Sequence, residues 1–339
     1  MRLPPTTVTD ARFPTGLIAG CKLTAASVLM SVCLCVALSS SASAAFPGAS
    51  GRIAFQREAQ RNVDIYTISS SGSNIRRLTK APLEDKWPAW SPDGIKIAIT
   101  RSVGGRNEVW VMSAQGNRVR RLATNAWDPA WSPDGSRIAY TSARNDGLDI
   151  MVVPATGGPA TDVTSAAGND FDPAWSPDGS TILFAGSRGE LGEATHIYAL
   201  HLDGSRLDQL TSGPDSDFRP NWAPDGKQIC FVRGNTRNFE MNGDQVLMSD
   251  YNIWTMDFDG SEQRQVSFGG NDWDPAWSPD GSQIAFASYR QRKSAEIYLM
   301  NSDGGRLRRL TRNNVDDLSP DWQPIRGELT ANGRAPGRP

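Results

Sequence analysis

One short sequence recurs along the chain and limits what it can fold into. Trp-Ser/Ala-Pro-Asp-Gly begins at five tryptophans, and a degenerate Trp-Gln-Pro closes the series; the six tryptophans are Trp90, Trp131, Trp175, Trp222, Trp277 and Trp322. Successive members are 41, 44, 47, 55 and 45 residues apart. A period of about 40–50 residues, with several short strands in each unit, is typical of propeller blades.

Each repeat contains four strand-like runs. In the repeat around Trp131 they are residues 129–131, 137–140, 149–153 and 160–164, all rich in apolar, β-branched or aromatic residues and bounded by Gly, Pro, Asp and Ser. Between the first two runs, Pro133 presets φ and Gly135 accepts a positive φ. The aspartate of the Trp-Ser/Ala-Pro-Asp-Gly sequence is expected to accept hydrogen bonds within its own turn. The tryptophans are expected to wedge between adjacent sheets.

The second strand-like run occurs six times between residues 53 and 286. By contrast, the final copy of the first run, at 320–322, is not followed by a second run. We therefore expect an all-β fold: a six-bladed β-propeller of four-stranded antiparallel blades over residues 51–324. The C-terminal run would complete blade one as its innermost strand. Closing the ring in this way removes exposed sheet edges.

The N-terminal segment differs in kind from the repeats. Arg2, Arg12 and Lys22 precede an apolar run at 23–38, and Ala42-Ser43-Ala44 follows it. This order predicts a secretory signal peptide over residues 1–44 and a periplasmic or secreted protein. A retained membrane anchor and a lipoprotein signal ending at Cys21 are the alternatives.

Composition and charge bear on the remaining segments of the chain and on its possible partners. We expect a linker at 45–50, a disordered tail at 325–339 and a monomer without a stable membrane span. The net charge of −2 argues against nucleic acid as a partner. Beyond the predicted signal, Cys230 is alone, which rules out a disulfide framework in that part of the chain.

The strand order assigns the connections to two faces. Tight turns join the first run to the second and the third to the fourth, and they share one face. The longer connections share the opposite face, including a polar loop expected at 234–251, so we expect binding there.

Acids stand three residues or one residue before the proline of most first runs, near the expected channel mouth. The residues predicted to bind a partner there are Asp85, Asp128, Asp170, Asp172, Asp217, Arg219, Asp272, Asp274 and Asp317. Their oxygens could hold Ca²⁺ or receive a basic peptide; alternatively, each acid caps its own loop.

Arginines are frequent in the connections between the second and third runs. They are Arg57, Arg61, Arg101, Arg106, Arg144, Arg188, Arg233, Arg237, Arg290 and Arg292. Together with the acids they could form a patterned surface for a protein partner. Alternatively, they are solvated loop charges that pair with the neighbouring acids.

Catalytic motifs are scarce in this sequence. The two histidines, His196 and His201, are five residues apart, and the sequence contains neither a G-x-S-x-G nor an H-E-x-x-H motif. An enzyme acting at the channel mouth, either a hydrolase or a lyase, remains an alternative, as does a purely architectural propeller.

The repeat closely resembles the WD-like repeat of the TolB β-propeller family. The matching words include residues 274–286, 296–304 and 308–311, and the resemblance covers about 51–324. It implies a six-bladed exported propeller that binds a protein or peptide in the cell envelope at its channel mouth. TolB proteins carry an α/β domain before the propeller, which is not expected here, so the resemblance concerns the propeller only.

Overall fold

The computed structural model describes residues 46–59, 62–144, 147–164, 168–188, 194–241, 244–291 and 293–325. These residues belong to one unit that spans Ser39–Pro339. The predicted signal peptide and nearly all of the predicted tail lie outside the described residues. Every regular element in the described part is a strand, which confirms the all-β class. This part of the chain accordingly holds no helix that could cross a membrane.

The strands follow the repeat. In the first half they are β1 (Ala49–Ala59), β2 (Asn62–Ser69), β3 (Arg76–Arg77), β4 (Asp85–Trp90), β5 (Lys96–Val103), β6 (Arg106–Ser113), β7 (Arg120–Thr124), β8 (Ala126–Trp131), β9 (Arg137–Arg144), β10 (Gly147–Pro154), β11 (Thr161–Asp162) and β12 (Gly168–Trp175). In the second half they are β13 (Thr181–Ser187), β14 (His196–His201), β15 (Leu207–Gln209), β16 (Ser216–Trp222), β17 (Gln228–Met241), β18 (Asp244–Asp257), β19 (Arg264–Gln265), β20 (Asp272–Trp277), β21 (Gln283–Ser288), β22 (Glu296–Asn301), β23 (Arg308–Arg309) and β24 (Asp316–Ile325).

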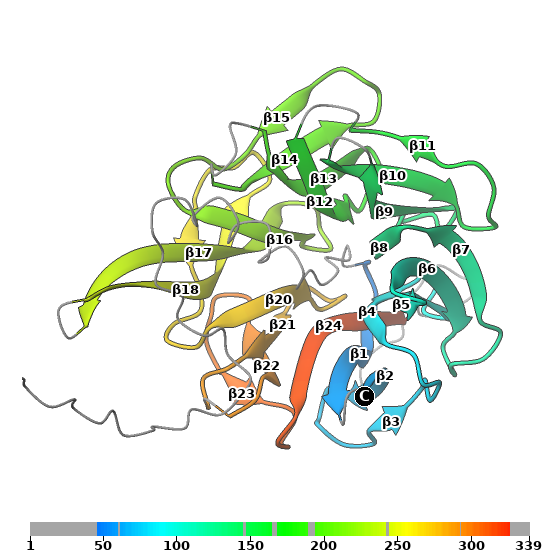
Figure 1. Cartoon of the computed structure of the whole chain (residues 1–339), viewed down its shortest axis with the longest axis horizontal. Coiled ribbons are helices and arrows are strands. Elements are labelled where there is room, and N and C mark those ends of the chain that lie inside the picture. Colours follow the sequence, from blue (N-terminus) through cyan, green and yellow to red (C-terminus); the bar gives the residue numbers. More distant parts are fainter. Residues whose placement is uncertain are drawn as a thin grey trace, which may run out of the picture. The chain divides into compact units, whose positions relative to one another are not determined.

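The strands assemble into four-stranded antiparallel groups. Four sheets have the orders β24-β1-β2-β3, β4-β5-β6-β7, β16-β17-β18-β19 and β20-β21-β22-β23. The groups β8–β11 and β12–β15 join into one eight-stranded sheet through a short parallel pairing of Gly147 with Gly168 and Leu148 with Asn169. Figure 1 shows β4, β8, β12, β16, β20 and β24 nearest the centre of this unit.

The last strand pairs with the first. Trp322 in β24 lies opposite Ile53 in β1, as the order of the repeats predicted. The pairing also reaches Ala49 and Ser50, which lie opposite Ile325 and Pro324. For this reason β1 begins two residues before the expected start of the repeat and β24 ends one residue after its expected end.

The Trp-Ser-Pro-Asp-Gly turn has the predicted conformation. Ser132 Oγ donates to Asp134 Oδ1 at 2.5 Å, and the same oxygen accepts from Ser136 N at 3.0 Å. Gly135 has φ of 70° and donates to Ser132 O at 2.9 Å. These hydrogen bonds lower the pKa of Asp134 to about 2. The aspartate therefore has a structural role in this turn.

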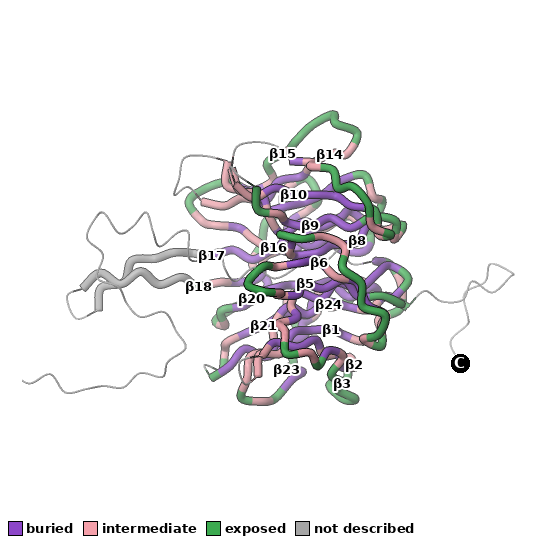
Figure 2. The backbone as a smooth tube through the Cα atoms, turned by 45° about the vertical axis from the view of Figure 1, so that its right-hand side comes forward, coloured by how far each residue is buried: buried purple, intermediate pink, exposed green. Residues whose placement is uncertain are grey.

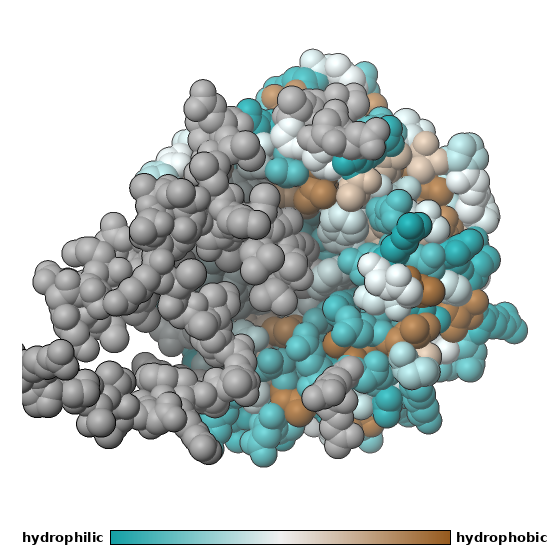
Figure 3. Space-filling view, in the orientation of Figure 1, coloured by the Kyte–Doolittle hydropathy of each residue, from teal (hydrophilic) through white to brown (hydrophobic). Residues whose placement is uncertain are grey.

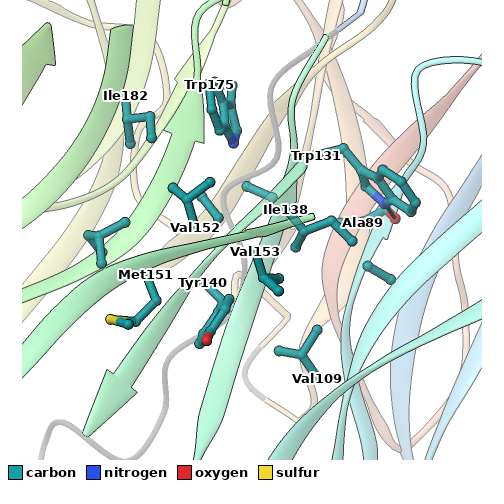
Figure 4. Close-up of a cluster of buried hydrophobic side chains, with 14 of the residues drawn as sticks. Ala89, Val109, Trp131, Ile138, Tyr140, Met151, Val152, Val153, Trp175 and Ile182 are labelled. Atoms are coloured by element: carbon teal, nitrogen blue, oxygen red, sulfur yellow. Dashed lines mark hydrogen bonds between the residues drawn. The ribbon is translucent and has the colours of Figure 1, made fainter. Parts of the chain in front are cut away.

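The core lies between neighbouring sheets. Trp131, on β8, is 1% exposed, and its indole Nε1 donates to the carbonyl oxygen of Ala89, on β4, at 3.1 Å. In Figure 4, Trp131 lies among Ala89, Val109 and Ile138, which come from two different sheets. Burying a tryptophan in this way contributes a large apolar area between the sheets. The tryptophans thus wedge between sheets, as expected.

One predicted loop is wrong. Residues 234–251 were expected to form a polar loop, but β17 and β18 extend through most of it and pair from Gln228↔Asp257 to Met241↔Asp244. An antiparallel ladder satisfies the backbone hydrogen bonds that a loop would leave to water. The sequence between the strands is Asn242-Gly243, the dipeptide most typical of two-residue hairpins, and that signal could have predicted the extension.

Candidate functional site on the loop face

The structure confirms that the two kinds of connection lie at opposite ends of the strands. Hydrogen bonds join the two tight turns of a sheet, as between Ala114 N and Ile95 O at 2.9 Å or Phe258 N and Lys227 O at 2.9 Å. We call this end the turn face and the opposite end the loop face. In the space-filling view, the part of the molecule drawn in colour mixes hydrophilic and hydrophobic residues (Figure 3).

Five of the nine predicted residues form ion pairs with arginines that lie on the paired neighbouring strand or directly after it. We call them the paired acids: Asp85 with Arg101 at 2.6 Å, Asp170 with Arg188 at 2.5 Å, Asp217 with Arg233 at 2.7 Å, Asp272 with Arg290 at 2.9 Å and Asp317 with Arg57 at 2.6 Å. The acids are 0–2% exposed. The alternative in which loop arginines pair with neighbouring acids therefore describes these five arginines.

The arginines of these pairs are also held by aromatic rings. The guanidinium carbon of Arg233 lies 4.7 Å from the ring centroid of Trp254, and that of Arg57 lies 4.8 Å from that of Tyr66. Two hydrogen bonds join Arg233 to Asp217, at 2.7 and 2.9 Å. A guanidinium fixed on two sides loses little further rotamer freedom. The pairs therefore stiffen the base of the loop face.

Asp170 has a pKa that is shifted toward neutrality. Burial raises its pKa to about 7, while Arg188 opposes the shift. Burial also raises the pKa of Asp317, against the hydrogen bond from Arg57. The proton occupancy of Asp170 thus changes near neutral pH.

The residue before the proline of each inner strand has a left-handed backbone. We call these six residues the central ring: Trp87, Asp128, Asp172, Arg219, Asp274 and Ser319, with φ between 52° and 57°. Their side chains are 0–6% exposed. A register shift occurs at the same point in each inner strand, as between Trp127 and Ala130. Such a bulge re-aims a side chain, which separates this ring from the paired acids.

Arg219 connects three inner strands within the central ring. Its guanidinium lies 2.5 Å from Asp172 Oδ1 on β12 and 3.3 Å from Asp274 Oδ1 on β20. Asp274 Oδ2 accepts in turn from Ser319 N, on β24, at 3.1 Å. The arginine side chain is 4% exposed, so these bonds act in a medium that screens charge weakly. Asp172, Arg219 and Asp274 therefore form a buried network.

Asp128 has the most unusual environment in the central ring. It is 0% exposed, and neither of its carboxyl oxygens has a hydrogen-bond partner among the described residues. Burial, followed by the nearby Asp172 carboxylate, raises its pKa well above the ordinary value. Burial and the Asp172 carboxylate therefore both disfavour the charged form of Asp128.

The nine residues therefore fall into two groups, the paired acids and members of the central ring, and none of them is exposed. Within the described residues, no group of three or more His, Cys, Asp or Glu side chains has the arrangement of a metal site. Arg219 already supplies a positive charge between Asp172 and Asp274.

A cavity on the loop face was not anticipated from the sequence. Its volume is about 380 Å³, and its lining includes Glu58, Asn62, Glu84, Lys293, Asn314 and Asp316. These residues come from connections around β1–β2, β22 and β24. Burial raises the pKa of Glu58, and Asp316 and Glu84 raise it further. Burial likewise raises the pKa of Asp316.

This cavity is an acidic recess with one lysine at its lining. Carboxyl groups with raised pKa values gain from a nearby cation, because it favours their charged form. The recess therefore suits a positively charged group. The sequence contained no signal for it, since its residues meet only when β24 pairs with β1.

Comparisons with known proteins agree with this geometry. A model of the TolB β-propeller domain matches residues 123–258. TolB from Acinetobacter baumannii has a similar structure, with a TM-score of 0.69 and 22% identity, over 81% of this chain and 67% of that one. A putative TolB from Agrobacterium tumefaciens gives a TM-score of 0.61 and 24% identity, over 81% and 92%. The fold is a TolB-like β-propeller.

Sequence relatives of this TolB-like propeller match over short segments. The Tol-Pal system protein TolB of Anaeromyxobacter dehalogenans is 30% identical over 86 residues, which is 24% of this chain and 20% of that protein. An uncharacterized peptidase, YuxL, of Bacillus subtilis is 43% identical over 51 residues, or 15% and 8%. The chain thus spans a fifth or less of the length of these relatives.

Proposed function

We propose that this TolB-like propeller is an exported protein that binds a protein or peptide through its loop face. The observation that carries the proposal is the acidic cavity around Glu58 and Asp316, which opens on the face with the long connections. Elsewhere in the inner strands, the paired acids are neutralised by their own arginines, and Arg219 offsets Asp172 and Asp274 in the central ring. A rigid base under variable loops is the usual architecture of a binding surface.

The ligand chemistry follows from the cavity. Two carboxyl groups with raised pKa values, Glu58 and Asp316, lie beside Glu84 in a half-enclosed space. A lysine or arginine side chain of a partner would relieve their mutual repulsion. We therefore propose a basic segment as the bound group, with binding that weakens as salt is added.

A peptide-display selection against the purified chain tests this proposal. We expect enrichment of Lys- and Arg-containing peptides, and loss of that enrichment in Glu58→Gln/Asp316→Asn. Glu262→Gln is the matched control, because Glu262 is an exposed acid at the turn face. Selection that is indifferent to peptide charge would refute the basic ligand.

Direct partner contact by the nine predicted residues stays a prediction. The pair Asp172→Asn/Asp274→Asn tests it within the same selection. If partner contact is confined to the cavity, these substitutions lower stability but leave the affinity of the folded protein unchanged. A loss of affinity at unchanged stability would assign the contact to the central ring.

Ring closure is the architectural part of the proposal. We propose six blades, with the group β8–β11 and the group β12–β15 as separate blades and with β24 completing the blade of β1–β3. Deleting residues 316–325 should then abolish cooperative unfolding, because β1 would lose its inner partner.

A periplasmic or secreted location, with a signal cut after Ala44, predicts a mature protein whose N-terminal sequence begins Ala45-Phe46. Calorimetric titration with Ca²⁺ tests the predicted cation.

A further inference from the structure

Charge is distributed unevenly around the propeller. Residues 49–124, which contain β1–β7, hold 13 Lys and Arg against 6 Asp and Glu. Residues 125–267, which contain β8–β19, hold 9 against 21. The near-neutral total therefore hides a basic sector beside an acidic one. Sectors of opposite charge steer binding even when the net charge is small.

The outermost strands of the basic sector share one short sequence. In β3, β7 and the adjoining β23, two arginines follow an exposed aliphatic residue: Ile75-Arg76-Arg77, Val119-Arg120-Arg121 and Leu307-Arg308-Arg309. The aliphatic side chains are 46%, 37% and 46% exposed, respectively. Figure 2 shows exposed residues along β3 and beside β23.

The second arginine of each strand is neutralised within its own sheet. Arg77 pairs with Asp64 at 2.7 Å, Arg121 with Glu108 at 3.2 Å and Arg309 with Glu296 at 2.6 Å. Each of these acids lies near the start of the adjacent strand, which is β2, β6 or β22. The second arginines therefore complete the fold and are not the free charges of the sector.

The first arginine of each strand has no such partner. Within the described part of the chain, Arg76, Arg120 and Arg308 form no ion pair. Arg120 donates to the carbonyl oxygens of Ala155 and Thr156, at 2.7 and 3.1 Å, and keeps its full charge. We call Ile75, Arg76, Val119, Arg120, Leu307 and Arg308 the arginine–aliphatic edge.

The edge continues onto the turn face. Ile95 and Ile325, in turns or at a strand end of the same sector, are 59% and 48% exposed. Both ends of the described chain also lie there: Gly48 N donates to Pro279 O at 3.1 Å, and Gln323 Nε2 donates to Gly94 O at 2.8 Å. Gly48, close to the first described residue, therefore lies at this face.

The chemistry of the edge suits an anionic surface more than a shaped ligand. Its charges and aliphatic groups are spread over three outer strands, whereas the acidic cavity lies on the loop face. The edge contains no aromatic ring on which a nucleic-acid base could stack. Guanidinium groups bind phosphate strongly, and aliphatic side chains between them can enter the boundary between headgroups and acyl chains.

We propose that the arginine–aliphatic edge docks the propeller on an anionic lipid bilayer, with the turn face toward the membrane and the loop face away from it. Arg76, Arg120 and Arg308 contact lipid phosphates, and Ile75, Val119 and Leu307 enter the headgroup layer. This arrangement leaves the acidic cavity accessible to a partner. It stands independently of whether that cavity binds a basic segment.

Vesicle flotation of the full chain tests the proposal, with phosphatidylcholine vesicles that contain or lack phosphatidylglycerol. We expect Arg76→Gln/Arg120→Gln/Arg308→Gln to lower the partition coefficient for anionic vesicles by about fivefold per charge, or about 100-fold together. The corresponding lysine variants should bind nearly as the parent does. Ile75→Ser/Leu307→Ser should also weaken binding.

The acidic sector offers matched controls. Arg264 lies opposite Thr255 in β18–β19 as Arg76 lies opposite Thr67 in β2–β3, and Leu207 occupies the position of Leu307. Arg264→Gln and Leu207→Ser should leave vesicle binding unchanged. Matching thermal midpoints would show that the variants are folded. If Arg264→Gln lowered vesicle binding as much as the substitutions in the arginine–aliphatic edge do, binding would not be localised to that edge and the proposal would be overturned.

Hydrogen exchange of the full chain locates the contact without relying on affinity. Anionic vesicles should slow exchange at residues 75–77, 119–121 and 307–309, but not at 207–209 or 263–265. Protection elsewhere only, or vesicle binding that is unaffected by the arginine substitutions, would overturn the proposal. Self-association that depends on the arginines, without vesicle protection, would assign the edge to a second copy and overturn it too.

Discussion

Asp321 Oδ2 accepts a hydrogen bond from the backbone N–H of Trp90 at 2.6 Å, and so joins the inner strand β24 to the inner strand β4. Asn221 makes the same contact elsewhere, since its Oδ1 accepts from Trp277 N at 3.0 Å. The other four inner strands have alanine at this position. Burial raises the pKa of Asp321 to about 8, so at neutral pH it largely carries a proton. The acid therefore acts here much as the amide does.

Replacing Asp321 by asparagine should remove a pH dependence of stability. Between about pH 4 and pH 8 the folded chain holds a proton on Asp321 that the unfolded chain has lost, so the free energy of unfolding falls as pH rises. Relative to the parent protein, we expect Asp321→Asn to be more stable by about 3–4 kcal/mol at pH 8 than at pH 5. Urea unfolding at both values measures it.

Asn221→Asp is the reciprocal control for this experiment. It should introduce the same fall in stability toward high pH, because the buried site and the donor, Trp277 N, are equivalent. Equal effects of Asp321→Asn at pH 5 and pH 8 would contradict a proton on Asp321.

Arg219 should be essential for stability because it offsets buried carboxylates. In Arg219→Met, Asp172 and Asp274 would lose their partner, and we expect a loss of about 3–5 kcal/mol. The loss should shrink at pH 5, where the carboxyl groups take up protons more readily. Arg233→Met removes the partner of the single acid Asp217 at a more exposed site and should cost less. A pH-independent loss would argue against the buried network.

The sequence predicted the scaffold better than the site. Repeat spacing and turn residues were sufficient for the strand groups, the local hydrogen bonds of Asp134 and the pairing of Trp322 with Ile53. The partners of the acids depended on tertiary geometry. A left-handed residue before each proline turns Asp128 and Asp172 into the centre, whereas Asp85, two residues nearer the strand start than Trp87, faces Arg101 on the adjacent strand.

Replacing Trp131 should destabilise the protein more than replacing Trp90, although the two tryptophans are equally buried. Trp131 and Trp90 are both 1% exposed, but only Trp131 has a hydrogen-bond partner for its indole nitrogen among the described residues. Trp131→Phe should therefore cost about 1 kcal/mol more than Trp90→Phe, because it also removes the hydrogen bond from the indole to Ala89 O. Chemical denaturation of both variants provides the comparison, and equal costs would contradict it.

Ala126 marks the one inner strand that lacks a paired acid, and an acid should be tolerated there. Ala126 is 0% exposed and lies opposite Ser142, as Asp272 lies opposite Ser288. Arg290, the partner of Asp272, follows Ser288 by two residues, and Arg144 follows Ser142 by two residues. Arg144 now makes only long contacts, 3.8 Å to Asp149 and 3.7 Å to Asp162.

We therefore expect Arg144 to turn toward a carboxylate introduced by Ala126→Asp. Alone, Ala126→Asp should cost little, and Arg144→Gln should cost under about 1 kcal/mol, because its contacts are long and partly exposed. Together they should cost about 3–5 kcal/mol, since a buried charge is then left unpaired. A double-mutant cycle by urea unfolding measures this coupling. Additive effects would mean that residues 126 and 144 cannot meet, and that the pairing rule of the other sheets does not extend to β8 and β9.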